Sequence, residues 1–502
     1  MSVLSDLLQQ GAPVAGHRPW PRVMTDRQAW LAARERLTEG SLTLLGLWAE
    51  PATVHLGLLD QHGSEPGVMS IRCIDNEFPS VAGRHPPASR LERAIRDLYG
   101  LQPGGLADNR PWFDHGRWGL KAPLGTAKAV ATADPEYRFL PAEGDSLHQI
   151  PVGPVHAGII EPGHFRFTAG GETIVRLEAR LGYVHKGIEG LMAGTRLDRA
   201  AQLAGRISGD STVAYAIAFS RAAESALGLD VPQRAHWLRG LMAELERMAN
   251  HFGDIGGICN DAAFALMHAH CSVLRERILR ASAICFGHRL MRDRVVPGGV
   301  EVDLDATGVA SLGALIANIR QRFSALVELY ENTASLQNRT VGAGILKPEL
   351  THQYGAGGFV GRASGRAFDA RRSIGYPPYE SLDFDVPVRD DGDVNARVWI
   401  RIGEVEQSLR LVEQMLAHMP DGPLRVELPV RAGEGMALVE GFRGDILAWL
   451  RLGGDGVVRR CHLRDPSWFQ WPLLEAAIEG NIVADFPLCN KSFNCSYSGH
   501  DL

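Results

Sequence analysis

Short runs in which apolar and polar residues alternate dominate the first part of the chain. SLTLLGLWA (41–49), TVHLGLLD (53–60) and GVMSIRCI (67–74) have the two-residue period of half-buried strands. Between residues 89 and 101 the period changes, because Leu91, Ile95 and Leu98 lie three or four residues apart, which is typical of a helix. The pattern therefore predicts a small α+β module over residues 1–125.

The pattern changes again after residue 125. Residues 126–150 are rich in Ala, Pro and Gly, which predicts a linker. The runs 164–171 and 172–182 have the pattern of two strands around a Gly-Gly turn, and apolar stripes at helical spacing predict helices over 233–252, 307–333 and 403–418. Long helices with one apolar face pack as a bundle, so residues 151–502 are expected to form a mainly α domain with small β-sheets.

The composition is that of a folded protein, and it limits the classes of molecule that the protein could bind. Of the 502 residues, 45% are hydrophobic and 22% are charged, which is typical of globular chains. The formal charge of −6, from 52 basic and 58 acidic residues, argues against a nucleic-acid binder. Seven cysteines are too few for a disulfide scaffold, and no apolar run reaches the length of about 18 residues that indicates a membrane span. Since the first residues do not resemble a secretory leader, we expect a cytosolic chain that meets the membrane only through partner chains.

Five segments follow one another in a distinctive order: GPVHAGIIEPGHFRF (153–167), LGYVHKGIEGLMAG (181–194), RGLMAELERMANHFGDIG (239–256), GRASGRAFDARRSIGYPPYESLDFDVPVRDDGDVNARV (361–398) and RDPSWFQWPLLEAAIEGNIVADFP (464–487). They resemble the large subunit of membrane-bound, energy-converting NiFe-hydrogenases and the related 49-kilodalton-type subunit of respiratory complex I. In the N-terminal module, Pro79-Ser80-Val81, Glu92-Arg93 and Asp97-Leu98-Tyr99-Gly100 are similar to the 30-kilodalton-type subunit of complex I. The fusion of both parts resembles the large subunits of formate-hydrogenlyase and hydrogenase-4 type complexes, which implies a hydrogenase-large-subunit-like fold.

The resemblance also implies four metal-ligand positions, and these do not carry the expected residues. A nickel–iron centre needs two Cys-x-x-Cys pairs, because thiolates must bind nickel and bridge to iron. Ser208 and Ser211 stand at the first pair, and Ser496 and Gly499 at the second, although a shift of one residue would recover Cys495. Hydroxyls cannot bridge two metals as thiolates do, so we expect no intact nickel site and no cofactor held by this chain.

A purely structural explanation also exists for this region. Ser208, Asp210 and Ser211 precede the apolar run 212–220, where they could cap a helix by accepting its free N–H groups. The cysteines form no chelating pair, and we expect most of them to be small buried residues.

Several titratable residues are candidates for proton transfer. The loop histidines His156 and His164 lie where the complex I branch has a proton donor to quinone, although Gly209 replaces the tyrosine that accompanies it. A loop held by backbone hydrogen bonds is the alternative. Glu189 lies where hydrogenases have a proton-path glutamate, and it could face His185 four residues earlier at a helix start. A first-turn acid favoured by the helix dipole is the alternative.

Charges of alternating sign cluster between residues 362 and 393. We expect a buried ion-pair network near the site, with a solvated loop as the alternative; its members are Arg362, Arg366, Asp369, Arg371, Arg372, Asp383, Asp385 and Asp393. A quinone-sized cavity lined by His156, His164, Arg362 and Asp369 would favour a catalytic site over a packed one. The glycine-rich run 355–361 lacks the spacing of a dinucleotide fingerprint, so we expect a loop there and NAD binding only at the level of the whole complex.

The sequence thus predicts a non-nickel large-subunit homologue in a membrane-associated, complex-I-like oxidoreductase assembly that couples electron transfer to ion translocation. The resemblance implies three kinds of partner: a small subunit that holds an iron–sulfur cluster, a ferredoxin-like subunit and antiporter-like membrane subunits. Through these partners the chain is expected to lie on the inner face of the cytoplasmic membrane. A quinone is a candidate acceptor. A non-catalytic structural adaptor is the alternative, and an active NiFe-hydrogenase is a third interpretation.

Overall fold

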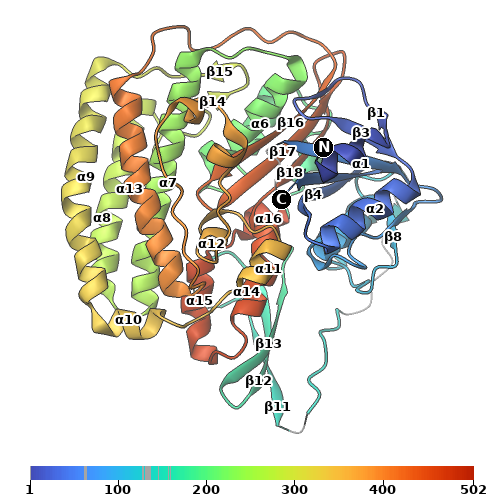
Figure 1. The fold of residues 1–502 in the computed structure, drawn as a ribbon, viewed down its shortest axis with the longest axis horizontal. Helices are drawn as coiled ribbons and strands as arrows, with labels where there is room; N and C mark the ends of the chain where they lie inside the picture. Colours follow the sequence, from blue (N-terminus) through green and yellow to red (C-terminus); the bar gives the residue numbers. More distant parts are fainter. Residues whose placement is uncertain are drawn as a thin grey trace.

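The computed structural model describes residues 2–60, 65–126, 129–130, 137–144, 146–156, 158 and 160–502. A bundle of long helices lies at one side of the molecule, a β-sheet lies in the middle, and the N-terminal module lies at the other side (Figure 1). The α+β module and the mainly α domain predicted from the sequence are therefore both present.

The N-terminal module is built on a five-stranded sheet with the order β1-β3-β6-β5-β4. The strands are β1 (Ala12–Pro13), β3 (Arg22–Thr25), β4 (Leu42–Glu50), β5 (Thr53–Asp60) and β6 (Pro66–Arg72), and the helices are α1 (Val3–Gln9), α2 (Arg27–Thr38) and α3 (Ser89–Tyr99). The three predicted strands and the predicted helix are confirmed. Every residue of β4 is buried, because one face packs inside the module and the other faces the C-terminal domain.

A second sheet joins the two ends of the chain. Its order is β18-β17-β16-β2, in which β2 (His17–Arg18) from the module pairs in parallel with β16 (Gly433–Gly441). The other strands are β17 (Gly444–Leu452) and β18 (Val458–Arg464). The Ala-rich helix α6 (Thr212–Leu227) packs on this sheet so closely that a Cβ at Gly435 would clash with the Ala222 carbonyl oxygen. Small residues on both elements make this close approach possible.

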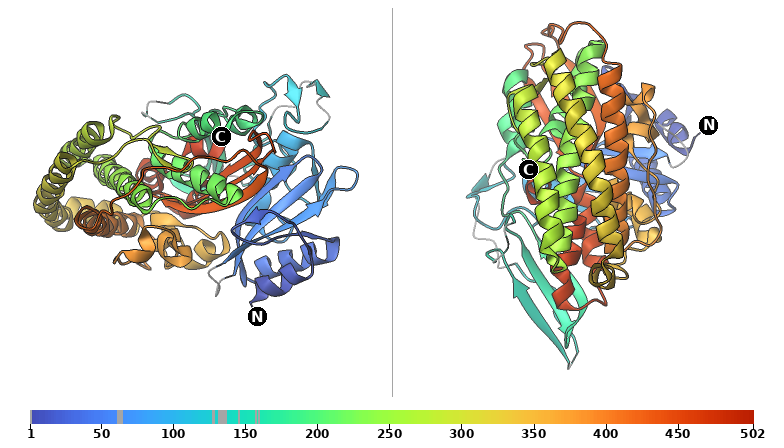
Figure 2. Two further views of the ribbon diagram at one scale, coloured as in Figure 1. Left: turned by 90° about the horizontal axis from the view of Figure 1, so that it is seen from above. Right: turned by 90° about the vertical axis from the view of Figure 1, so that its left-hand side faces the viewer.

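A three-stranded antiparallel sheet projects from the body of the molecule (Figures 1 and 2). It consists of β11 (Leu147–Val152), β12 (His164–Gly170) and β13 (Thr173–Arg180). The strand pair predicted over 164–182 is confirmed, whereas β11 begins inside the range expected to be a linker.

Four long helices form the bundle: α7 (Gln233–Asp261), α8 (Ala265–Phe286), α9 (Ala306–Asn332) and α13 (Val394–Ala417), seen side by side in Figure 2. The three predicted helices are confirmed, but α13 begins at Val394 rather than near 403. Asp393 caps it by accepting from the Ala396 N–H at 2.7 Å. Its first turns contain the buried Arg397 and Arg401, which interrupt the apolar stripe, so the hydrophobic pattern alone does not reveal this start.

The remaining elements are short and mostly connect the larger ones. The helices are α4 (Ile188–Met192), α5 (Leu197–Ala204), α10 (Ala334–Thr340), α11 (Pro348–Gln353), α12 (Gly358–Arg362), α14 (Ser467–Ala477), α15 (Phe486–Phe493) and α16 (Tyr497–Asp501); the strands are β7 (Glu77–Pro79), β8 (Gln102–Gly104), β9 (Leu120–Lys121), β10 (Ala129–Val130), β14 (Val295–Val296) and β15 (Gly299–Val300). Within the described part of the chain, no helix is both long enough and apolar enough to cross a bilayer.

The N-terminal module shares its hydrophobic core with the C-terminal domain. One continuous cluster of buried residues contains Leu44 and Ile95 of the module together with Trp471 and Phe493 near the C-terminus. Polar contacts cross the same boundary, since Arg464 of β18 donates to the Leu45 carbonyl oxygen at 2.8 Å. The two parts are therefore held together by an extensive interface.

Candidate functional site

The four residues at the expected metal-ligand positions lie together in the fold. Ser208 and Ser211 precede α6, while Ser496 and Gly499 lie at the start of α16. The Ser496 hydroxyl lies 3.4 Å from the Ser208 hydroxyl, and the Gly499 N–H donates to Ser496 Oγ at 2.9 Å. Ser496, which the gapless alignment puts at the first position of the second pair, therefore lies beside Ser208 of the first pair.

An ion pair is hydrogen-bonded to two members of this hydroxyl cluster. Asp210 Oδ1 accepts hydrogen bonds from Ser208 Oγ at 2.5 Å and Ser211 Oγ at 3.2 Å. Both Asp210 oxygens pair with the Arg443 guanidinium from the β16–β17 turn. Burial opposes ionisation of Asp210, but Arg443 and the hydroxyls stabilise its carboxylate and lower its pKa to about 2. The Asp210 side chain is 32% exposed, so a charged group lies at the surface of the cluster.

The prediction that these residues cap α6 is wrong. Ser211 is the N-cap residue, but neither its side chain nor that of Asp210 accepts from the first turn. Instead, Glu246 of α7 accepts from the Val213 and Ala214 N–H groups at 2.7 and 3.0 Å. Burial, with the nearby Asp210 charge, raises the pKa of Glu246 to about 8. No local pattern identifies a cap that comes from another helix.

Both loop histidines contact the backbone of their own loop, as expected if their role is to hold the loop in place. His156 Nδ1 accepts from the Gly158 N–H at 3.0 Å, and His164 Nδ1 lies 2.9 Å from the Gly153 carbonyl oxygen. Arg166 Nε donates to the other ring nitrogen of His164 at 3.3 Å, and burial lowers the pKa of this histidine. His164 also lines a cavity of about 570 Å³ together with Arg180 and Tyr183, whereas His156 does not.

The predicted contact between His185 and Glu189 does not form. α4 begins at Ile188, after Gly187 with its positive φ of 65°, so His185 lies outside the helix. Its Nδ1 lies 2.7 Å from the Asp501 carbonyl oxygen, and its ring stacks between Phe113 and Trp118.

Glu189 is held by two residues of β18 that belong to no sequence motif. The Arg460 guanidinium donates to Oε2 at 2.8 Å, and His462 Nδ1 lies 2.7 Å from Oε1. Because strand β18 is far away in the sequence, only the fold reveals these partners.

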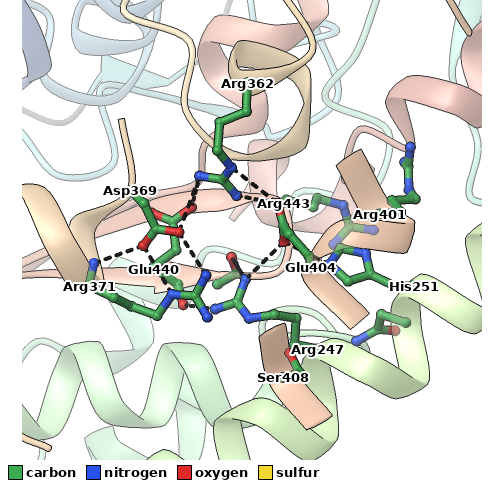
Figure 3. A network of polar contacts seen from close by, with 12 residues as sticks. Arg247, His251, Arg362, Asp369, Arg371, Arg401, Glu404, Ser408, Glu440 and Arg443 are labelled. Carbon is green, nitrogen blue, oxygen red and sulfur yellow. Dashed lines mark hydrogen bonds and ion pairs between the residues drawn. The ribbon is translucent and has the colours of Figure 1, made fainter. Parts of the chain in front are cut away.

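The charged cluster forms a buried network, shown in Figure 3. Arg362 pairs with Glu404 at 2.5 Å and with Glu440 at 2.9 Å, and Arg371 pairs with Asp369 at 2.7 Å. Burial opposes ionisation of Glu404, but Arg362 and His251 hold its pKa well below the usual range. Burial and the Asp369 charge raise the pKa of Glu440 to about 7. The prediction of buried ion pairs is confirmed for this part.

Other members of the cluster lie elsewhere. Arg366 and Asp393 are buried, whereas Arg372 is not. The Asp383 and Asp385 side chains are 82% and 81% exposed and pair with Arg410 at the surface, so their predicted burial is wrong.

A cavity lined by both loop histidines and by Arg362 and Asp369 would have favoured a catalytic site, but the described residues do not form one. The Arg362 and Asp369 side chains are 0% and 1% exposed and are enclosed by their ion-pair partners.

The glycine-rich run 355–361, expected to be a loop, is only partly one, because Gly358–Arg362 forms α12. Gly358, with a φ of 65°, lies against the Arg443 carbonyl oxygen, where a Cβ would clash. This glycine therefore serves close packing.

Comparison with known proteins identifies the family. The family model for the 49 Kd subunit of respiratory-chain NADH dehydrogenase matches residues 261–432. Formate hydrogenlyase subunit 5 of Escherichia coli is 33% identical over 440 residues, which cover 85% of this chain and 77% of that protein. The chain belongs to the family of complex I 49-kDa subunits and NiFe-hydrogenase large subunits.

Other relatives and a solved structure also match most of the chain. Hydrogenase-4 component G of Escherichia coli is 33% identical over 437 residues, covering 85% of this chain and 76% of that protein. An NADH-quinone oxidoreductase protein of the C/D type from Bacteroides thetaiotaomicron is 30% identical over 436 residues, covering 82% of each chain. A chain in the structure of the membrane-bound sulfane sulfur reductase, an archaeal respiratory membrane complex, superposes with a TM-score of 0.68 at 26% identity, covering 71% of this chain and 99% of that one.

The residues at the family's metal site do not fit a nickel–iron centre. Three hydroxyls and a glycine replace the four thiolates, and a Cβ at Gly499 would clash with the Asp465 carboxylate, which accepts from the Tyr215 hydroxyl at 2.6 Å. The neighbouring Cys495 belongs to the hydrophobic core, and burial raises the pKa of its thiol. Nowhere in the described residues do three or more His, Cys, Asp or Glu side chains group as a metal ion would require.

Proposed function

We propose that this chain is a large subunit that works without nickel in a membrane-associated, complex-I-like oxidoreductase assembly. The observation that carries the proposal is the hydroxyl cluster. The four family positions converge, but they carry no thiolate, and two of them, Ser208 and Ser211, are hydrogen-bonded to Asp210, which pairs with Arg443. Ion pairs and hydroxyls can bind and pass protons, but they do not store electrons. Electrons would then pass through a partner, while this chain couples their transfer to proton or ion movement.

The proposed partners follow from the relatives. Their names describe a formate hydrogenlyase, a hydrogenase, NADH-quinone oxidoreductases and a respiratory membrane complex. We expect an iron–sulfur small subunit to cover the exposed side of Asp210, with a ferredoxin-like subunit and antiporter-like membrane subunits completing the assembly. The chain would lie at the inner face of the cytoplasmic membrane, and a quinone would be a candidate acceptor in a pocket shared with a partner.

A structural adaptor is the second candidate. Two observations favour it. His156 and His164 make hydrogen bonds to the backbone, and Arg362 makes hydrogen bonds to Glu404 and Glu440. Few polar groups are therefore left to bind a substrate. In that case the chain would be required for assembly of the complex but would not affect its turnover.

The absence of nickel is tested by elemental analysis. The chain would be produced together with active hydrogenase-maturation factors, with a four-cysteine relative produced in parallel as the positive control. We expect nickel well below one atom per chain, because hydroxyl oxygens are hard donors that bind nickel weakly and do not bridge to iron. About one nickel per chain would contradict the proposal.

The assembly is tested by isolating the tagged chain from membranes of its host. We expect it to be recovered with a protein that contains an iron–sulfur cluster and with a protein that spans the membrane many times. A chain recovered alone under mild detergent conditions would remove both candidate functions.

A further inference from the structure

A cavity of about 180 Å³ lies between α7, the second half of α8 and the loops that precede α6 and follow α8. Its lining residues include Gly209 and Asp210 before α6, Glu246 and Ala249 on α7, and Arg289 after α8. A water molecule needs roughly 10–15 Å³ of cavity and a few polar partners, so this cavity has room for several waters.

Two of the lining side chains reach the surface. Asp210 is 32% exposed, and Arg289, which pairs with Glu276 at 2.7 Å, is 53% exposed. Since Asp210 and Arg289 lie on different loops, water can enter the cavity from two sides. In the proposed assembly a small subunit covers the exposed side of Asp210, which would leave the side beside Arg289 in contact with water.

The carboxyl group of Glu246 is placed to exchange a proton with this cavity. Its two oxygens accept from the Val213 and Ala214 N–H groups at 2.7 and 3.0 Å, which fixes the carboxyl group at the start of α6. N–H groups only donate, so the hydroxyl proton of the acid form needs another acceptor, which a water in the cavity can supply. With its pKa raised to about 8, Glu246 can hold a proton and release it near neutral pH.

The charges that surround Glu246 differ in sign. Asp210 raises the pKa of Glu246, and Arg247 on the same helix lowers it. Arg275 on α8 and Arg289 after it add positive charge to the wall of the cavity. Asp210 itself stays ionised, because its ion pair and the serine hydroxyls stabilise the carboxylate. Among the described lining residues, Glu246 is therefore the one whose protonation can change near neutral pH.

We propose that this cavity is a water-filled proton route between the hydroxyl cluster and solvent, with Glu246 as the proton carrier. In each passage Glu246 gives its proton to a water on one side and takes a proton from a water on the other side. One proton crosses, no bond between heavy atoms changes, and no electron is needed. The inference rests on the proposed role in coupling electron transfer to proton movement, and it names the path of that movement.

Infrared spectroscopy of the full chain tests the route without the rest of the assembly. Below the pKa of Glu246, the spectrum should contain the C=O band of a protonated carboxyl group that is missing in Glu246→Gln. On transfer to D₂O this band should shift within the mixing time, because cavity water exchanges the proton. Absence of such a band, or exchange only over minutes or longer, as for a group that waits for local opening, would overturn the proposal.

Variants that fill the cavity test the location. Ala249 lines it on α7, on the same face as Glu246, so Ala249→Leu should slow the exchange of the Glu246 proton to minutes or longer. Gly209→Leu fills the cavity from the loop before α6, where a Cβ meets no atom within 4 Å, and decides the matter if the first variant does not fold.

Gly313→Leu is the matched control for these variants. Gly313 lies on α9 with open space around its Cβ and is not among the described residues that line the cavity, so exchange should be as fast as in the wild type. Equally fast exchange in a folded cavity-filling variant would show that the proton reaches solvent by another way and would overturn the proposal.

Turnover of the assembled complex tests whether protons use the route. Glu246→Gln should lower turnover and ion transport about 10-fold or more, because a positioned acid–base group typically contributes about 10²–10⁴-fold. Glu246→Asp, which keeps an acid, should restore part of this loss. Glu224→Gln is the control, because Glu224 is a buried carboxylate that pairs with Arg239 on the far side of α6 from no described part of the cavity lining, and it should act on stability alone.

The outcomes separate this route from the proposed function. Unchanged turnover in a well-assembled Glu246→Gln complex, beside a wild type that couples turnover to ion transport, would overturn the route and leave the proposed function standing. A wild-type complex without such coupling would contradict the proposed function, and the exchange measurement on the chain would then decide whether the route exists.

Discussion

Glu404 lies at the centre of the buried network on α13. Its carboxylate pairs with Arg362 and with His251 from α7, and its side chain is 0% exposed. Replacing Glu404 by Gln leaves the Arg362 charge with less compensation in a buried position, which typically costs about 3–5 kcal/mol. We expect urea unfolding to show a loss of this size.

Asp385 provides the matched control for Glu404. Its carboxylate is 81% exposed and pairs with Arg410 at the surface. Asp385→Asn should change the free energy of unfolding by no more than about 0.5 kcal/mol. Equal effects of the two substitutions would mean that the network is accessible to water.

Glu246 predicts a pH dependence of stability. Burial raises its folded-state pKa from 4.5 to about 8, so between these values the folded protein retains a proton that the unfolded chain has lost. The free energy of unfolding of the wild type should therefore fall, relative to Glu246→Gln, as pH rises through this window. Chemical denaturation at several pH values measures the difference, and Glu39→Gln, at the exposed C-cap of α2, should track the wild type throughout. A difference that does not vary with pH would show that Glu246 is already ionised at the lower end of the window.

At the scale of elements, β2 and β16 join the first and last parts of the chain. Arg22 beside this junction pairs with Glu434 at 2.5 Å, and the two parts share one hydrophobic core. Strand pairing, ion pairing and apolar burial therefore act across the same boundary.

This boundary leads to a prediction for limited proteolysis. The composition of residues 126–150 makes this range the expected site of cleavage. Because of the shared core, we expect the two fragments to remain together in size-exclusion chromatography and to separate only in denaturant. Separate elution of the N-terminal fragment under native conditions would contradict this expectation.

At the scale of the whole molecule, the residues that could move protons lie in different places. Asp210 is in the hydroxyl cluster, while His164 and Glu189 line two neighbouring cavities that share Phe113, Trp118 and His185. In the assembled complex, His164→Ala and Glu189→Gln are expected to lower acceptor reduction and ion transport, because they remove titratable groups that line these cavities.

Two further measurements separate a role in turnover from a role in folding. Ser208→Ala removes a hydrogen bond to the Asp210 carboxylate and is expected to lower stability, which unfolding of the variant measures. The recovery of partner subunits shows whether each variant assembles. Full activity of well-assembled His164→Ala and Glu189→Gln complexes would favour the structural adaptor.

The element order and the missing thiolates could be predicted from the sequence alone. The strands of the N-terminal module, the β12–β13 pair and the long helices follow from apolar periodicity, which is a property of neighbouring residues. The sequence alone likewise gives the residue types at the four aligned positions, which are Ser208, Ser211, Ser496 and Gly499. The start of α13 could not be predicted in this way, because buried arginines break the periodic pattern there.

Which side chains meet was decided only by the tertiary structure. Asp210 and Arg443 are separated by 233 positions, and Glu189 and His462 by 273, yet each pair shares hydrogen bonds. The same packing assigns the cap of α6 to Glu246 and encloses Arg362 and Asp369 among ion-pair partners, so that they line no cavity with the loop histidines. Local patterns determine elements, because backbone conformation depends on near neighbours, whereas ion pairs, caps and cavities depend on how these elements pack together.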